Sequence, residues 1–310
     1  ALLPWLDRGA TLLLHQPFKL EIFLEQMRDE AVVFSSCPPG ILHDLLKRGD
    51  LVKERDFPAL CYVSSGSAAL PEWVMREFHD RFGVEILNFY GSSEGASLSA
   101  TAPDLPDAGI RARYFPRFGD GKHRWRLGSS RLMETRLVDT ATGAPIDEAG
   151  RPGELCFRGP NVFAGYYRLP EVTQRTFDAD GFYHTGDLFE IAGDDDQYFR
   201  FVGRAKDIIV RGGMNISAEE IETLLSEHPA IQEVAVVGYP DDRLGEKVCA
   251  VASVKPGVTV SLDEIVAYLR ETKKVAVYKL PQRLKLVDRL PRSPAGKVLK
   301  TPLRELAGVD

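Results

Sequence analysis

The sequence predicts an α/β protein in two parts. The first is a partial large domain, which combines a parallel βα sheet with a barrel-like antiparallel layer, and the second is a small mobile α+β domain at the C-terminal end. Strand-length apolar runs first alternate with helical periodicity, then give way to short strands broken by glycine, and end in a compact unit with two helix-start signals. We place the large domain at 1–206 and the small domain at 207–310.

In the first segment, apolar runs predict strands at 10–14, 32–34, 60–63 and 84–89, with helical spacing at 20–27, 41–46 and 74–82. Alternation of strands and helices favours a parallel sheet, whose ligands bind beyond the carboxyl ends of the strands. Two of these ends carry small or polar residues, at 64–68 and 90–94. We therefore expect two binding loops along one edge.

The later segments predict different elements. Short strands at 135–139, 153–158, 197–202 and 207–210 favour an antiparallel layer. After the glycine pair 212–213, Ser217 and Ser261 each stand three residues before a glutamate, which is the pattern of a capping box at a helix start. Strands at 234–237 and 248–254 lie between these helices, which indicates a compact α+β unit.

Composition limits the classes of partner. The chain has 310 residues, a formal charge of −6 and 44% hydrophobic residues, and no apolar run approaches the ~20 residues of a membrane span. This argues against a nucleic-acid-binding protein and against a membrane span. The four cysteines are far apart, so we expect buried, reduced thiols in a cytoplasmic protein. The chain begins like the middle of a fold, so we expect a fragment.

Basic residues dominate the segment 111–136. A solvated loop is the favoured interpretation, because charge runs usually face water, and a phosphate-binding patch is the alternative.

Two motifs offer ligand chemistry. In the segment 88–95, glycines allow close approach of a ligand, and Glu94 is a hard-oxygen ligand suited to Mg²⁺, although a plain polar turn remains open. In the segment 180–187, Asp187 follows a glycine turn and could accept hydrogen bonds from both hydroxyls of a ribose. His184 is expected to be a turn residue, and the six histidines show no metal-ligand spacing.

Two further loops are open to more than one interpretation. The segment 203–216 contains a polar turn and paired glycines, which suits a hinge and channel wall, or a β-hairpin with an exposed tip. Lys297 lies in a loop with two prolines and a glycine. It is either a surface cation or a mobile charge delivered onto a phosphate.

The order and spacing of these motifs resemble the adenylate-forming superfamily of acyl-CoA synthetases, peptide-synthetase adenylation domains and luciferases, over essentially the whole chain. The resemblance implies a role for each motif. Nucleotide binding is assigned to Ser65, Gly66, Ser67, Tyr90, Gly91, Asp187 and Arg204; catalysis to Ser93, Glu94 and Lys297; Mg²⁺ to Glu94; the acyl pocket to Asn88, Phe89 and Gly95; the hinge to Asp207; and the CoA channel to Gly212 and Gly213.

The resemblance implies a carboxylate–CoA ligase that uses ATP, Mg²⁺ and coenzyme A. A small carboxylic acid is activated to an acyl-adenylate with release of pyrophosphate, and a domain rotation about Asp207 then withdraws Lys297 and admits the thiol. The family's phosphate loop is expected to precede residue 1. Two alternatives remain: an enzyme that loads a carrier-protein thiol, and a truncated chain that binds adenylate without full activity. The sequence identifies neither the acid nor the oligomeric state.

Overall fold

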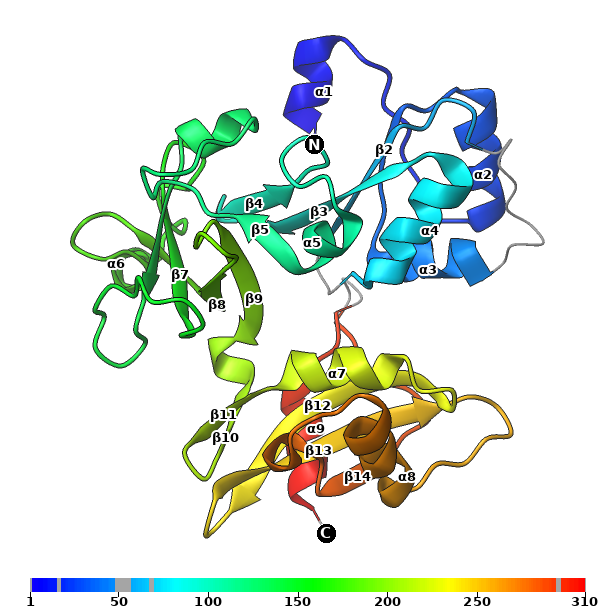
Figure 1. Ribbon diagram of the computed structural model, residues 1–310, viewed down its shortest axis with the longest axis vertical. Coiled ribbons are helices and arrows are strands. Elements are labelled where there is room, and N and C mark those ends of the chain that lie inside the picture. Colours follow the sequence, from blue (N-terminus) through cyan, green and yellow to red (C-terminus); the bar gives the residue numbers. More distant parts are fainter. Residues whose placement is uncertain (1, 16–17, 48–56, 67–69, 294–296, 310) are drawn as a thin grey trace. The chain divides into compact units, whose positions relative to one another are not determined.

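The computed structural model describes residues 2–15, 18–47, 57–66, 70–293 and 297–309 (Figure 1). The chain forms two compact units. The first contains Ala1–Gly91 and Ser97–Phe115, and the second contains Ser92–Ala96 and Pro116–Asp310. The boundary predicted at residue 207 lies inside the second unit and remains a prediction. Among the described residues, no helix combines the length and apolar character needed to cross a membrane.

The first unit contains a mixed sheet covered by helices. Strands β1, β2 and β3 are parallel, as the alternating pattern predicted, and β4 returns antiparallel to β3. The strands are β1 (Phe34–Ser36), β2 (Tyr62–Gly66), β3 (Glu85–Gly91) and β4 (Ser97–Ala100), and the helices are α1 (Leu2–Arg8), α2 (Leu20–Asp29), α3 (Pro39–Lys47), α4 (Glu72–Phe82) and α5 (Ala108–Arg113).

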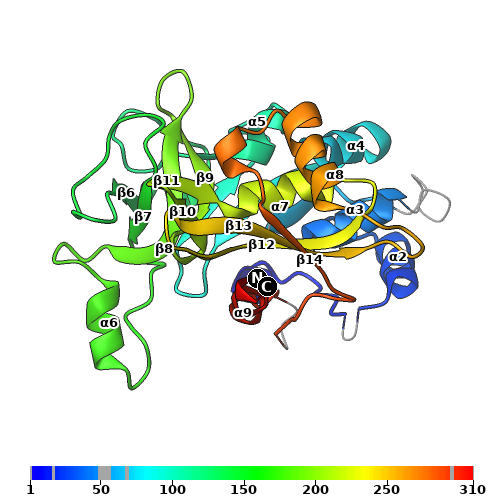
Figure 2. The ribbon, with the colours of Figure 1, turned by 90° about the horizontal axis from the view of Figure 1, so that it is seen from below.

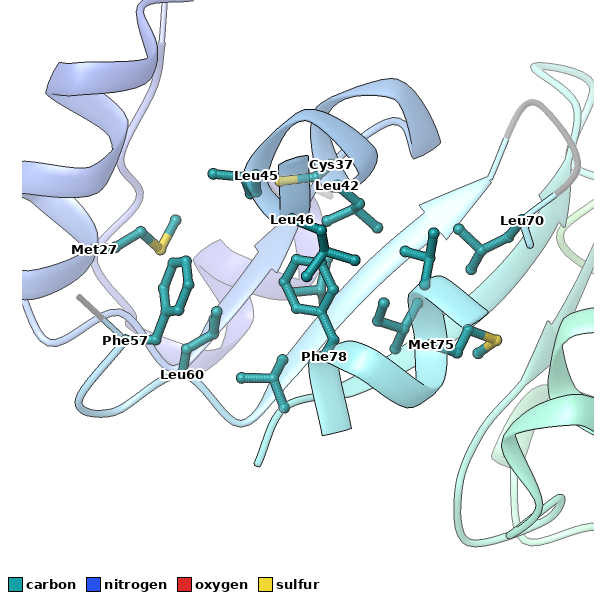
Figure 3. Close-up of a cluster of buried hydrophobic side chains, with 14 of the residues drawn as sticks. Met27, Cys37, Leu42, Leu45, Leu46, Phe57, Leu60, Leu70, Met75 and Phe78 are labelled. Atoms are coloured by element: carbon teal, nitrogen blue, oxygen red, sulfur yellow. The ribbon is translucent and has the colours of Figure 1, made fainter. Parts of the chain in front are cut away.

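Apolar faces of three helices form the core of this unit. α2 contributes Met27, α3 contributes Leu42, Leu45 and Leu46, and α4 contributes Phe78, and these pack around the buried side chains of β2 and β3 (Figure 3). The spacing of three and four residues places them on one side of each helix. The helical periodicity in the sequence therefore predicted which faces of α2, α3 and α4 are buried in the first unit.

The strand predicted at 10–14 is wrong, because the chain is irregular there after α1. A strand needs a hydrogen-bonded neighbour, and β1, which begins at Phe34, is the terminal strand of the described sheet on that side. An apolar run alone did not reveal that this segment pairs with none of the described strands.

The basic segment 111–136 is not one solvated loop. Arg111, in α5, is 1% exposed, forms an ion pair with Glu85, and donates hydrogen bonds to the carbonyl oxygens of Leu105 and Pro106, each at 2.8 Å. The buried guanidinium is tolerated because Glu85 neutralises its charge and the two carbonyl oxygens accept from Nη1, although Nε has no partner among the described residues. The sequence pattern counted Arg111 as a surface charge because its partners lie outside the segment.

The cysteine prediction is also wrong in one case. All four thiols are free, and three are buried, but Cys61 is exposed. It lies just before β2, between the buried residues Leu60 and Val63.

The second unit begins with the predicted antiparallel layer. Its strands form an open sheet in the order β9-β8-β7-β6. They are β6 (Glu134–Val138), β7 (Gly153–Arg158), β8 (Tyr183–Ala192) and β9 (Tyr198–Arg204); β5 (Tyr114–Pro116) spans the boundary between the units, and α6 (Pro170–Thr176) precedes β8. β8 contains the whole motif 183–187, which the sequence had placed in a turn.

The same unit ends in the predicted α+β structure. Strand order is β11-β10-β13-β12, with β14 parallel to β13. The strands are β10 (Ile208–Arg211), β11 (Met214–Ser217), β12 (Ile231–Asp241), β13 (Gly245–Val254) and β14 (Arg283–Leu286), and the helices are α7 (Ala218–Ser226), α8 (Leu262–Ala267), a π-helical turn (Tyr268–Thr272) and α9 (Lys300–Gly308). Ser217 caps α7, and Ser261 forms the full capping box of α8.

The long hairpin β12–β13 is covered on both faces. Val236, Val248 and Ala250 pack with α7 and α8 on one side, whereas Val237 and Val251 pack with α9 on the other (Figure 2). Successive side chains of a strand point to opposite faces, so a continuous apolar run is required here. This explains why the sequence shows unbroken runs instead of alternation.

Candidate active site

The turn that carries Glu94 needs a glycine at position 95. The Ser92 N–H donates to the Ala96 carbonyl at 2.9 Å, which closes the turn. Gly95 has φ +97°, and a Cβ at this position would lie 1.8 Å from the Asn161 carbonyl oxygen. Only glycine combines this backbone conformation with so close an approach.

The Glu94 carboxylate is held by tyrosines. The Tyr166 hydroxyl donates to Glu94 Oε1 at 2.9 Å. Burial alone would raise the pKa of Glu94, but the hydrogen bond from Tyr166, with smaller contributions from its own backbone and from the nearby Ser92 and Tyr183, lowers this pKa below its usual range. Glu94 is therefore ionised at neutral pH.

Ser92 lies close enough to influence the pKa values of both Glu94 and Tyr183. Its buried hydroxyl nevertheless makes no geometrically sound hydrogen bond with the described residues. Because a hydroxyl can rotate, Ser92 is able to donate to a bound group.

Sequence reasoning missed Tyr166. The aromatic side chains of Phe163, Tyr166, Phe177 and Tyr183 form one cluster, with ring centroids 4.8–6.0 Å apart. The cluster fixes the phenol that contacts Glu94. A signal existed in the aromatic-rich segment 163–167, but no spacing rule links it to a carboxylate so far away in the sequence.

Asp187 and Arg204 lie opposite each other on β8 and β9. Arg204 Nε is 3.3 Å from Asp187 Oδ1; the Asp187 side chain is 11% exposed and the Arg204 side chain 50%. The carboxylate is thus shielded, while the guanidinium reaches solvent. This arrangement can combine acceptors for sugar hydroxyls with a cation for a phosphate.

The first turn of α7 lies next to this pair. Burial and the neighbouring Glu222 raise the pKa of Glu219 to about 7, although Lys300 and Arg204 act in the opposite direction. Glu222 accepts hydrogen bonds from Lys300 Nζ and from the Val236 N–H, each at 2.7 Å. The region therefore contains one carboxyl that titrates near neutrality.

A hydrogen-bonded pair supports the chain just before Asp187. Glu154 Oε1 accepts from the Gly186 N–H at 2.7 Å, and Glu154 Oε2 lies 2.8 Å from His184 Nδ1. His184 is therefore a strand residue with a hydrogen-bond partner, and not the turn residue that was expected. Burial, with the nearby Glu154 and Asp178 carboxylates, raises the pKa of the Cys156 thiol beside it.

The remaining nucleotide and acyl-pocket candidates belong to the first unit. Ser65 is buried, and its hydroxyl has no hydrogen-bond partner among the described residues. Asn88 Nδ2 donates to the Arg111 carbonyl at 3.0 Å, so this amide links β3 to α5. Phe89 is exposed, and Ser67 lies outside the described residues.

The nucleotide-binding candidate Tyr90 packs edge-on against Phe115, with ring centroids 6.3 Å apart. β3 continues through Tyr90 and Gly91 because β4 pairs with it, so the loop begins only at Ser92. Ser93, in that loop, is exposed.

The hinge, hairpin and lysine candidates lie in the second unit. Asp207 accepts a hydrogen bond from Arg304 Nη2 at 2.6 Å. Gly212 and Gly213, both with positive φ, form the exposed two-residue turn between β10 and β11, which confirms the predicted hairpin. Lys297 is exposed, and its ammonium group has no partner among the described residues.

Comparison with known proteins identifies the family. Residues 1–167 match the AMP-binding enzyme family, and residues 220–297 match the AMP-binding enzyme C-terminal domain. The chain belongs to the family of AMP-binding enzymes. The resemblance inferred from the motifs is therefore confirmed.

Relatives of this AMP-binding enzyme include ligases. The medium-chain fatty-acid–CoA ligase of Escherichia coli K12 is 39% identical over 253 residues, which cover 81% of this chain and 41% of that protein. The mitochondrial medium-chain acyl-CoA ligase ACSF2 of Rattus norvegicus is 34% identical over 303 residues, which cover 96% of this chain and 46% of that protein.

Among solved structures, ATP-bound MatB from Rhodopseudomonas palustris matches with a TM-score of 0.80 at 29% identity, covering 97% of this chain and 56% of that one. The chain thus spans about half the length of the proteins that it matches.

Proposed function

We propose that the protein carrying this chain is an AMP-forming carboxylate–CoA ligase. The observation that carries the proposal is the shielded Asp187 carboxylate paired with Arg204, in the same unit as the ionised Glu94. The names of the ligases related to it support this activity. Medium-chain acids are the first substrates to test, because both ligase names specify them.

In this proposal, Asp187 binds the ribose of the nucleotide. Its carboxylate is acceptor-only when ionised, so two vicinal hydroxyls are suitable donors. Arg204 holds one carboxylate oxygen and keeps half of its side chain in solvent, where it can contact a phosphate or the ribose. Together they orient the nucleotide for attack.

The residues present fit a magnesium ion. Glu94 is held ionised by Tyr166, and a carboxylate oxygen is a ligand that this hard cation prefers. Glu94 would hold Mg²⁺, which supplies charge neutralisation at the phosphates when it is bound. The rotatable Ser92 hydroxyl offers a donor nearby.

Two half-reactions follow. The substrate carboxylate attacks the α-phosphorus of ATP, pyrophosphate leaves, and an acyl-adenylate forms; the CoA thiolate then attacks the acyl carbon, and AMP leaves. Lys297 would stabilise charge in the first half, since its ammonium group is exposed and unpaired among the described residues. Asp207 is the proposed pivot between the halves, and the Gly212–Gly213 turn is the proposed channel wall.

The test separates the two half-reactions. Carboxylate-dependent exchange of pyrophosphate into ATP measures the first, and thioester formation from preformed acyl-adenylate measures the second. We expect Lys297→Ala to reduce exchange by at least about a hundredfold, in line with loss of an electrostatic donor, and to leave thioester formation largely unchanged.

Lys122→Ala, at another exposed lysine, is the matched control and should affect neither assay. Equal losses in both assays with Lys297→Ala would refute the separate roles. Supplying a carrier-protein thiol in place of CoA tests the alternative acceptor, and a preference for the carrier would contradict the proposal.

A further inference from the structure

Three side chains with metal-ligand chemistry meet on the β7–β8 pair. Cys156 Sγ lies 3.5 Å from His184 Nδ1, and His184 Nδ1 lies 2.8 Å from Glu154 Oε2. One ligand atom from each residue lies within 4.8 Å of the others. None of these atoms has a role in the proposed reaction.

One of the three ligand distances already matches a tetrahedral metal centre, and the other two lie within 4.8 Å. With metal–sulfur and metal–nitrogen bonds of about 2.3 and 2.0 Å, neighbouring ligand atoms lie about 3.3–3.7 Å apart. The separation of Cys156 Sγ and His184 Nδ1 is already in this range. The Glu154–His184 contact needs to open by roughly half an ångström, which a carboxylate can do by rotating about its side-chain bonds.

Access and rigidity also suit an ion. Cys156 is fully buried, while the Glu154 and His184 side chains are 16% and 30% exposed, so the group opens to solvent on one side. Cys156 and His184 face each other in the β7–β8 register, and Glu154 stands two residues before Cys156. A strand pair holds ligands more firmly than a loop does.

A second carboxylate is placed to orient the imidazole. Asp178 Oδ2 lies 4.0 Å from His184 Nε2, the nitrogen on the far side of the ring. Asp178 is itself fixed, because its other oxygen accepts from the N–H groups of Asp180 and Phe182, each at 2.9 Å. Histidines that bind metals commonly direct their second nitrogen to such a partner.

We propose that Glu154, Cys156 and His184 form a binding site for a zinc-class divalent cation, with solvent completing the tetrahedron and Asp178 orienting the imidazole. Sulfur and imidazole donors favour zinc over magnesium. As the ion binds, the Cys156 thiol releases its proton to solvent, and the proton on His184 Nδ1 is replaced by one on Nε2, on the side of Asp178. A dication is then balanced by one thiolate and one carboxylate.

The site would stabilise the strand that leads to Asp187. An ion on Glu154 Oε2 leaves Oε1 free to keep its hydrogen bond from the Gly186 N–H. It would therefore join β7 to β8 three residues before Asp187. Zinc should raise the thermal unfolding midpoint, because an ion that binds only the folded state stabilises it.

Cobalt(II) is the spectroscopic probe for this site. Titration of the complete protein with Co²⁺ should give a thiolate-to-cobalt charge-transfer band in the near ultraviolet and tetrahedral bands in the visible region. Zn²⁺ should displace them. We expect Cys156→Ser to abolish the charge-transfer band, and His184→Gln and Asp178→Asn to weaken Co²⁺ binding by about tenfold or more.

Controls use another thiol and another histidine–carboxylate pair. Cys61→Ser removes the exposed cysteine, and His79→Gln removes an imidazole whose Nδ1 lies 2.9 Å from Glu85 but which belongs to no group of three metal-ligand side chains among the described residues. Both should leave the spectrum unchanged. Thermal unfolding without metal checks that each variant folds, and Cys156→Ala replaces Cys156→Ser if serine is not tolerated.

Two outcomes would overturn the proposal. One is a folded wild-type protein that gives no charge-transfer band in excess Co²⁺. The other is a band that survives substitution of Cys156. Neither outcome bears on ligase activity, because the titration needs no ATP, acid or CoA.

Discussion

Arg204 faces Asp187 directly across the β8–β9 pair, with its Nε 3.3 Å from a carboxylate oxygen of Asp187. The register of the two strands sets this contact, so the fold itself places the two side chains next to each other. The pair is therefore ready before any nucleotide binds.

Asp187→Asn should weaken AMP binding by about ten- to a hundredfold, because hydrogen bonds to a charged group contribute about 1.5–3 kcal/mol. Isothermal titration with AMP measures this. Asp194→Asn alters an exposed carboxylate beyond the end of the same strand and should leave the affinity unchanged. If both variants bind AMP like the wild type, Asp187 does not contact the ribose.

Tyr166→Phe should raise the Mg²⁺ concentration needed for half-maximal pyrophosphate exchange by roughly tenfold. The substitution removes the hydrogen bond to Glu94, which helps keep this carboxylate ionised and oriented. Tyr167→Phe is the matched control, since this neighbouring side chain is 83% exposed. An unaltered Mg²⁺ dependence in Tyr166→Phe would separate Glu94 from the metal.

Glu219→Gln should stabilise the protein more at pH 8 than at pH 5. The pKa of Glu219 is raised to about 7 in the folded state, so the folded protein holds a proton that the unfolded chain releases at lower pH. Stability contributed by this group is therefore lost as pH rises from the unfolded pKa through about 7.

The difference between the two pH values should be about 2 kcal/mol in the free energy of unfolding, measured by urea denaturation. Glu305→Gln, at an exposed position of α9, should show no such difference. Equal effects of Glu219→Gln at both pH values would mean that the carboxyl titrates normally.

Gly95→Ala should destabilise the second unit by about 2 kcal/mol or more, because it combines a strained positive φ with a clash at the Asn161 carbonyl. Gly128→Ala is the control, since an added Cβ there meets nothing within 4 Å and φ is not positive. Urea unfolding of both variants makes the comparison. Similar stabilities would show that the loop adapts.

The sequence predicted elements whose residues are close together in the chain. The helices of the first unit, the strands β7 and β13 and the Ser261 capping box all depend on local periodicity or a local motif. The sequence could not predict which segments form hydrogen bonds or ion pairs with each other. The run at 10–14 looked like a strand but pairs with no strand in the described part of the chain, and Arg111 looked like a surface charge but has buried partners.

The candidate site shows the same limit. The motifs predicted Glu94, Asp187 and Arg204 individually as site residues. That Asp187 lies opposite Arg204 depends on the register of β8 and β9, which the motifs do not give. Tyr166 and the group of Glu154, Cys156 and His184 were missed, because their contacts join residues some 30 or 70 positions apart. No motif defined by sequence spacing predicts contacts between residues so far apart.

The coverage of β12–β13 on both faces has a consequence for strand alignment. A shift by one residue would exchange the two sets of buried side chains, and apart from Tyr239 both sets consist of small or β-branched residues. Away from Tyr239, apolar content therefore does not exclude the shifted pairing. The polar turn of the hairpin opposes the shift: Asp241 accepts from the N–H groups of Arg243 and Leu244 and pairs with Lys247 at 2.5 Å. One aromatic ring and a few polar atoms at one turn thus fix the alignment of strands whose other buried side chains would fit either pairing.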